Sequence, residues 1–220
     1  MINTRFDAVI FDMDGTLLQS ETYCIEAVQK AITDIYKERN IQEKIVDKEK
    51  ILAEVGKPSL QFYQSIIPGK YIYLADEVRH KVCDNEKRFL RAGKGKLFDG
   101  VMDMLLFLKE SDIRLAMLSN ASSDYFWTVI EVFQLNRFID KALCIGDFPY
   151  ESKATLLRKI IMDFSAKNPV MVGDRVYDIE AGKHNHCFTI GCLYGYGSAD
   201  ELNQADLLID NILELRKLFL

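Results

Sequence analysis

The sequence predicts an α/β fold, a doubly wound parallel sheet with an all-helical segment inserted after its first strand. Short apolar runs alternate with amphipathic stretches from residue 97 to the C-terminus, as they do in a parallel sheet covered by helices on both faces. Residues 20–90 show only the three-to-four-residue spacing of helices. We therefore expect a core of residues 1–18 and 92–220, and a helical insertion of residues 19–91.

The first predicted strand, Ala8–Phe11, is a short and wholly apolar run, which is typical of a strand buried on both faces. Asp12 and Asp14 follow it two residues apart, so their side chains point to the same side of an extended chain. Gly15 then provides a turn by which the chain leaves the sheet. Two ionised carboxylates this close repel each other, so the pair indicates a bound cation or a raised pKa. A polar strand end with solvated acids is the alternative.

Apolar residues recur three or four positions apart through the helical insertion, with charged residues between them, which predicts helices. The stripe of the first helix consists of Ile25, Val28, Ile32 and Ile35. The later helices are expected at residues 48–55, 60–67 and 75–90. Asp47 is a candidate N-cap for the helix at residues 48–55. The basic, glycine-containing run 91–96 is expected to be the linker back to the core.

The core resumes at residue 97 with alternating helices and strands. Further strands are expected at residues 113–118, 142–145, 170–172, 188–192 and 207–209. Further helices are expected at residues 101–109, 124–133, 153–164 and 212–219, and another begins after Asp174. Parallel sheets of this kind bind ligands outside the carboxyl ends of their strands.

The composition is that of a globular protein, because 49% of the 220 residues are hydrophobic and 28% are charged. The net charge of 28 − 33 = −5 argues against nucleic acid or an anionic membrane as a partner, so a small anionic substrate would need local positive charge. The five cysteines show no C-x-x-C spacing, which favours reduced thiols over a zinc site. Without a signal peptide or a run of membrane-spanning length, the sequence predicts a cytoplasmic protein.

Polar side chains follow two later strands of the predicted sheet. Ser119 and Asn120 end the strand at 113–118, where a hydroxyl and backbone N–H groups suit phosphate oxygens, although a plain capping turn is the alternative. Lys153 opens a helix, where the helix dipole disfavours a cation. That cost is explained if the ammonium group balances a phosphate or Asp12. An exposed surface lysine is the alternative.

The run Val170–Gly182 contains a second pair of carboxylates. An apolar strand leads into Gly173, and Asp174 and Asp178 then stand four residues apart as the chain turns into a helix. Both side chains can therefore face one pocket.

Taken in order, these segments resemble the four motifs of the haloacid dehalogenase superfamily. The matching residues are Asp12-Met13-Asp14-Gly15-Thr16-Leu17, Leu118-Ser119-Asn120, Lys153, and Gly173-Asp174 followed by Asp178. The helical insertion directly after the first motif is similar to the cap of the phosphoglycolate phosphatase and β-phosphoglucomutase branch. One departure is Ala154, since the family often has proline after its lysine.

The resemblance implies a Rossmann-like core and a magnesium-dependent phosphatase that works through an aspartyl-phosphate. It makes Asp12 the nucleophile and Asp14 the acid that protonates the leaving oxygen; a carboxylate at this second position argues against a dehalogenase. The implied Mg²⁺ ligands are Asp12, Asp14 through its backbone carbonyl, Asp174 and, through ordered water, Asp178. The implied phosphate-binding residues are Gly15, Thr16, Ser119, Asn120 and Lys153.

The substrate is expected to be a small phosphorylated metabolite, and three functions stay open. The first is a phosphomonoester hydrolase, the second a phosphomutase on the same scaffold, and the third a catalytically inactive phosphate-binding or regulatory protein. Lys57, in a loop of the insertion that breaks a helix, is a candidate for binding an anionic group of the substrate, with a solvated turn lysine as the alternative. The oligomeric state stays open between monomer and homodimer.

Overall fold

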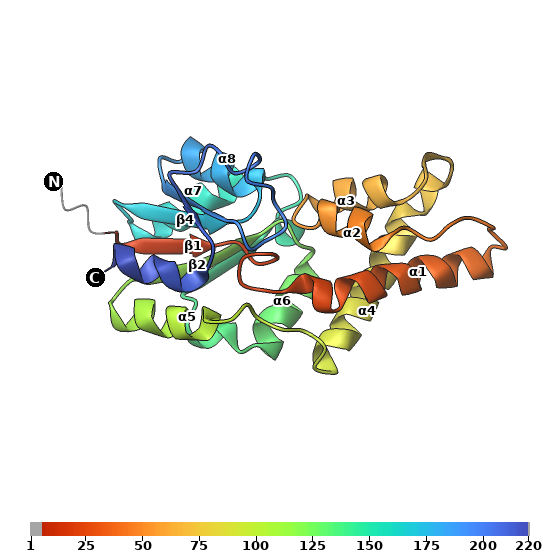
Figure 1. Cartoon of the computed structure of the whole chain (residues 1–220), viewed down its shortest axis with the longest axis horizontal. Helices are drawn as coiled ribbons and strands as arrows, with labels where there is room; N and C mark the ends of the chain where they lie inside the picture. Colours follow the sequence, from red (N-terminus) through yellow and green to blue (C-terminus); the bar gives the residue numbers. More distant parts are fainter. Residues whose placement is uncertain (1–5, 220) are drawn as a thin grey trace.

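The computed structural model describes residues 6–219 of the chain. Within this range, six strands form one parallel sheet in the order β3-β2-β1-β4-β5-β6 (Figure 1). The strands are β1 (Ala8–Phe11), β2 (Arg114–Ser119), β3 (Lys141–Cys144), β4 (Pro169–Gly173), β5 (Phe188–Cys192) and β6 (Leu207–Ile209). The predicted doubly wound α/β fold is confirmed.

Strand β1 lies in the middle of the sheet, between β2 and β4. Phe11 pairs with Met117 of β2 and with Val172 of β4. The backbone N–H of Asp12 donates to the Val172 carbonyl at 2.8 Å, so the ladder continues one residue past the strand. The strand order reverses between β1 and β4, which is where sheets of this type bind ligands.

Both faces of β1 are covered, as its apolar sequence predicts. Successive side chains of a strand point to opposite faces. Ile10 accordingly belongs to an apolar cluster with α7 (Lys153–Phe164), and Phe11 belongs to the larger cluster that includes α5 (Val101–Glu110). Figure 1 shows α7 and α5 on opposite sides of the sheet. The carboxyl end of β1 is therefore held from both faces.

The remaining core helices are α6 (Ser123–Val132), α8 (Val176–His184), and the 3-10 helices η3 (Leu135–Arg137), η4 (Ile145–Asp147) and η5 (Ile212–Leu218). The helical insertion contains η1 (Ser20–Thr22), α1 (Cys24–Glu38), α2 (Lys48–Glu54), α3 (Ser59–Ile66), η2 (Gly69–Leu74) and α4 (Ala75–Arg91). Helices α1 to α4 lie together beyond the end to which the arrow of β1 points (Figure 1). None of the helices within residues 6–219 is both long and apolar enough to cross a membrane.

The structure refines two local predictions. The last predicted helix is present at residues 212–218, as the 3-10 helix η5. Its buried residues Ile212 and Leu215 are three positions apart, which is the repeat of a 3-10 helix. Asp47 occupies the N-cap position of α2 without capping it. Its carboxylate instead pairs with Lys44, with 2.8 Å between Nζ and Oδ2.

We predict that the inner face of α7 carries much of the stability of the core. Ile160 is fully buried, whereas Met162 on the same helix is 67% exposed. Ile160→Ala should lower the free energy of unfolding by roughly 2–5 kcal/mol, because it removes buried methyl groups and leaves a cavity. Met162→Ala should change it by less than about 0.5 kcal/mol. Urea denaturation followed by circular dichroism measures both, and equal effects would contradict the assigned orientation of α7.

Candidate active site

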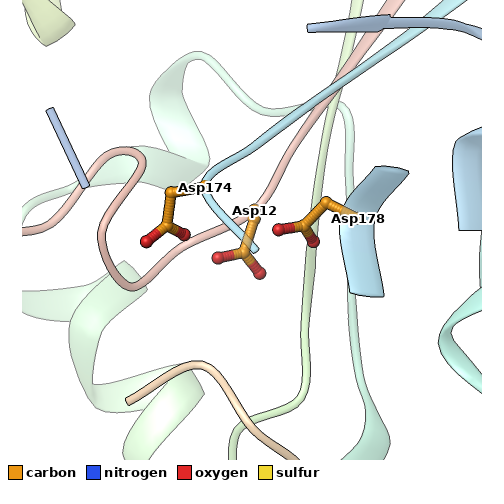
Figure 2. Close-up of side chains that lie close together, drawn as sticks. All are labelled: Asp12, Asp174 and Asp178. Atoms are coloured by element: carbon orange, nitrogen blue, oxygen red, sulfur yellow. The ribbon is translucent and has the colours of Figure 1, made fainter. Parts of the chain in front are cut away.

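Three buried carboxyl groups meet at the carboxyl edge of the sheet. Asp12 follows β1, Asp174 follows β4, and Asp178 lies in the first turn of α8. Each contributes one oxygen to a group whose members lie within 4.8 Å of one another (Figure 2). All three residues are at most 3% exposed. The carboxylates that the sequence places at separate strand ends thus occupy one position in space.

Asp178 is held by the start of its own helix. Its Oδ2 accepts a hydrogen bond from the backbone N–H of Arg175 at 2.9 Å. Gly173 makes this possible, because a Cβ at that position would overlap the Asp178 carboxyl group. The Oδ1 atom is buried and makes an ion pair with Lys153 without an aligned hydrogen bond. One oxygen of Asp178 therefore remains poorly satisfied by protein donors.

Lys153 reaches this cluster from the N-terminus of α7. Ser152 caps that helix by accepting from the Thr155 backbone N–H at 3.1 Å, which fixes where the first turn begins. The Lys153 ammonium group contacts Asp12 and lies 2.6 Å from Asp178 Oδ1. The residue is 7% exposed, so the alternative of an exposed surface lysine is wrong.

The cluster holds more negative than positive charge. Burial raises the pKa of Asp12 to about 7, with Lys153 lowering it and Asp178 raising it further. Burial also raises the pKa of Asp174 well above its usual value, and the charges of Asp12 and Asp178 add to the rise. Burial alone would lower the pKa of Lys153, but the two neighbouring carboxylates raise it.

This donor set fits a divalent metal ion. Hard divalent cations bind carboxylate oxygens, and magnesium is typically held by one or two carboxylates and several waters. A cation beside Asp12, Asp174 and Asp178 would relieve their mutual repulsion and satisfy the remaining oxygen of Asp178. The residues present therefore suit a divalent cation, and magnesium is the one that the family resemblance implies.

The carboxyl group of Asp14 lies apart from the cluster. Its Oδ1 accepts a hydrogen bond from Tyr125 at 2.6 Å and another from Ser20. Burial raises the pKa of Asp14, while these two hydrogen bonds lower it. Asp12 and Asp14 therefore have different environments. Tyr125 and Ser20 are not indicated by the sequence, since neither belongs to a recognisable motif.

Gly15 and Thr16, which the sequence suggests for phosphate binding, lie against Asp174. Gly15 has a φ of +83°, and a Cβ there would overlap Asp174 Oδ2, so only glycine fits. The Thr16 hydroxyl donates to Asp174 Oδ1 at 3.4 Å. In this structure, both residues help to position a carboxylate of the cluster.

Ser119 and Asn120 lie at the end of β2, beside the cluster. Ser119 is buried, and its Oγ accepts from the Ala121 backbone N–H at 3.1 Å. Asn120 Nδ2 donates to the carbonyl of Gly56, in the helical insertion, at 3.0 Å. Asn120 therefore joins the core to the loop that follows α2.

A cavity lies between the core and the helical insertion. It is lined on the core side by Asp12, Asp14, Ser119, Asn120, Ala121, Ser122 and Tyr125, and on the insertion side by Ser20, Cys24, Val55, Gly56, Lys57, Ser59, Phe62, Tyr63 and Glu86.

Lys57 reaches the cavity, but its ammonium group lies 2.6 Å from Glu54 Oε2. Burial would raise the pKa of Glu54, but hydrogen bonds from Lys57, Lys50 and Ser65 hold it at about 2. The charge of Lys57 is largely balanced within the insertion.

Arg175 connects the fourth motif to the insertion. Its guanidinium group donates to the carbonyl of Val55 and, at 3.3 Å, to that of Ala53. It also binds Glu201 Oε1 at 2.8 Å. The sequence does not predict that Arg175 binds the insertion. Its only signal is that Arg175 is a charged residue directly after Asp174. Arg175 therefore holds residues 53–55 of the insertion, next to the cavity.

Comparison with known proteins agrees with this fold and site. The family described as haloacid dehalogenase-like hydrolase matches the chain over residues 6–186. The chain belongs to this family, so the predicted superfamily and its hydrolase class are confirmed.

Relatives of known name match over nearly the whole chain. Pyrophosphatase PpaX from Listeria monocytogenes is 21% identical over 96% of this chain and 95% of that protein. Phosphoglycolate phosphatase from Vibrio cholerae is 25% identical over 93% of this chain and 92% of that protein. The crystal structure of a predicted phosphoglycolate phosphatase from Haemophilus somnus 129pt superposes with a TM-score of 0.84 at 18% identity, covering 99% of each chain. The structural match shows the shared fold.

We predict that Arg175 holds the 53–57 segment in place. Arg175→Lys keeps a positive charge beside Glu201 but loses the paired donors to the Ala53 and Val55 carbonyls. Amide hydrogen exchange, measured by mass spectrometry, should become faster in residues 53–57. Arg39→Lys, at an exposed ion pair with Glu77, is the matched control and should leave that segment unchanged. Unchanged exchange in the Arg175 variant would show that the loop is held by other contacts.

Proposed function

We propose that the protein is a magnesium-dependent phosphatase that hydrolyses a small phosphomonoester through an aspartyl-phosphate on Asp12. The observation that carries this proposal is the buried group of Asp12, Asp174 and Asp178 beside Lys153, which reaches the cavity under the helical insertion through Asp12. A nucleophile, a cation site and a substrate cavity in one place are what phosphoryl transfer requires.

In the proposed reaction, Asp12 attacks the phosphorus atom with a carboxylate oxygen. Lys153 stabilises the negative charge that builds on the phosphoryl oxygens, because its ammonium group already contacts Asp12. The hydroxyl group of Ser119, which also lines the cavity, is placed to donate to a phosphoryl oxygen. Asp12, Asp174 and Asp178 would hold the magnesium ion, which supplies positive charge to the same oxygens.

Asp14 supplies the proton transfers. Burial raises its pKa, so the protonated form is available to protonate the leaving oxygen as the ester bond breaks. The resulting carboxylate then takes a proton from the water that attacks the aspartyl-phosphate. Hydrogen bonds from Tyr125 and Ser20 orient the carboxyl group for both steps.

The names of the relatives support small phosphorylated substrates, since they include a pyrophosphatase, a 5'-nucleotidase and phosphoglycolate phosphatases. Hydrolysis is favoured over the phosphomutase alternative, because these relatives are named for hydrolytic reactions. The inactive phosphate-binding alternative is disfavoured, because Asp12 and Asp14 line one cavity and the carboxylates proposed to bind the cation lie against Asp12.

The first test is phosphate release from p-nitrophenyl phosphate with Mg²⁺. The wild-type protein should release inorganic phosphate, and Asp12→Asn should reduce kcat by roughly 10³-fold or more, because it removes the nucleophile. Asp99→Asn, at an exposed site 88% open to solvent, is the matched control and should retain activity. If wild-type protein releases no phosphate from this ester or from a panel of sugar and carboxylate phosphates, the hydrolase proposal fails.

A second test concerns the cation without relying on turnover. Mg²⁺ should raise the Tm of the wild-type protein in a thermal-shift assay, because a ligand that binds only the folded state stabilises it. Asp174→Asn should abolish most of that shift. Sodium chloride at matched ionic strength is the control for screening. A magnesium-dependent shift that survives in Asp174→Asn would place the cation elsewhere.

A further inference from the structure

Glu86 is a carboxylate that the proposed mechanism does not use. It lies on α4, one and two turns after the buried residues Val82 and Val78, so it interrupts an apolar stripe. The same side of α4 faces the start of α6. Cys83 lies 3.8 Å from the Ser122 hydroxyl, and Lys87 lies 3.0 Å from Asp124. An ionisable side chain therefore occupies a position directed toward the core.

Glu86 faces the cavity with no partner from the protein. Its half-buried side chain lines the same cavity as Asp12 and Asp14. Within residues 6–219, no hydrogen-bond donor or cation pairs with its carboxyl group. Its carboxyl group is therefore only partly enclosed and opens onto the cavity. Partial burial without a partner weakens the hydration of a carboxylate, and a hydrogen-bond donor on a bound ligand would offset that loss.

The rest of the cavity wall favours the same kind of ligand. Phe62, Tyr63 and Tyr125 provide aromatic surface beside Glu86, and such rings attract cations as well as apolar groups. The cation on the insertion side, Lys57, is paired with Glu54. A carboxylate on the leaving group would therefore meet Glu86 without a compensating charge. The cavity is small, with a volume of about 80 Å³, which favours a small leaving group.

We propose that Glu86 selects phosphomonoesters whose small leaving group carries a hydrogen-bond donor, either a hydroxyl or an ammonium group, and rejects those that carry a carboxylate. This inference rests on the proposed phosphatase function and adds the substrate class. A hydroxyl or an ammonium group can donate to the ionised Glu86 carboxylate, whereas a carboxylate on the leaving group offers no donor and is repelled by it. The aromatic side chains would strengthen binding of the ammonium form.

The test uses three esters with two-carbon leaving groups that differ only in the terminal group. These are 2-hydroxyethyl phosphate, 2-aminoethyl phosphate and phosphoglycolate. We expect kcat/KM of the wild-type protein to be at least about tenfold higher for the better of the first two than for phosphoglycolate, because two carboxylates brought together repel each other. The difference should lie mainly in KM, since Glu86 takes no part in the proposed bond-making and bond-breaking steps.

Glu86→Gln removes the charge at nearly constant shape. It should lower KM for phosphoglycolate by about tenfold and raise KM for the preferred ester by a similar factor. A loss confined to 2-aminoethyl phosphate identifies the ammonium group as the recognised donor, and a loss for 2-hydroxyethyl phosphate identifies the hydroxyl. Glu77→Gln, on the same helix at an exposed ion pair with Arg39, is the matched control and should leave the ranking unchanged.

The inference is overturned if phosphoglycolate is the best of the three substrates, or if Glu86→Gln leaves the ranking of a folded enzyme unchanged. The wild-type ranking decides the question even if the variant does not fold. Failure of the underlying function looks different, because no ester, p-nitrophenyl phosphate included, would then release phosphate.

Discussion

The incomplete charge balance among three buried carboxylates and one lysine is the constraint on which the site depends. Asp12, Asp174 and Asp178 crowd their oxygens within 4.8 Å, and Lys153 balances them only in part. Desolvated like charges are costly, so the surrounding structure must hold them in place. A site built in this way is preorganised for a cation and for the charge of a phosphoryl group, because little has to rearrange when they bind.

The sheet provides that rigidity. Strands β1 and β4 are hydrogen-bonded neighbours, so the residues that follow them cannot separate. Glycines then allow the closest approaches, since side chains at Gly15 and Gly173 would overlap Asp174 and Asp178. The helical insertion completes the cavity from the other side, and Arg175 and Asn120 hold its 53–56 segment through backbone carbonyls. The carboxylate cluster and the insertion side of the cavity thus come from different parts of the chain.

The sequence predicts the strands and the carboxylates at their ends because both follow from local patterns, namely apolar runs and the residues that terminate them. Arg175 and Glu86 could not be predicted in the same way. Their roles depend on how the insertion docks, and the contact between Arg175 and Val55 joins residues 120 positions apart. Lys57 is an intermediate case. Its partner Glu54 is three residues away, so the pairing is a local feature, but its effect on the cavity appears only in three dimensions.

The proposed mechanism depends most directly on the identity of the nucleophile. The decisive measurement is mass spectrometry of the protein quenched in acid during turnover of a phosphomonoester with Mg²⁺, followed by peptide mapping. The account predicts a peptide that contains Asp12 and carries the added mass of one phosphoryl group, and predicts its absence in Asp12→Asn. A phosphoryl group on another residue would contradict this mechanism. So would turnover that leaves the Asp12 peptide unmodified, provided that the quench is fast enough to trap the intermediate.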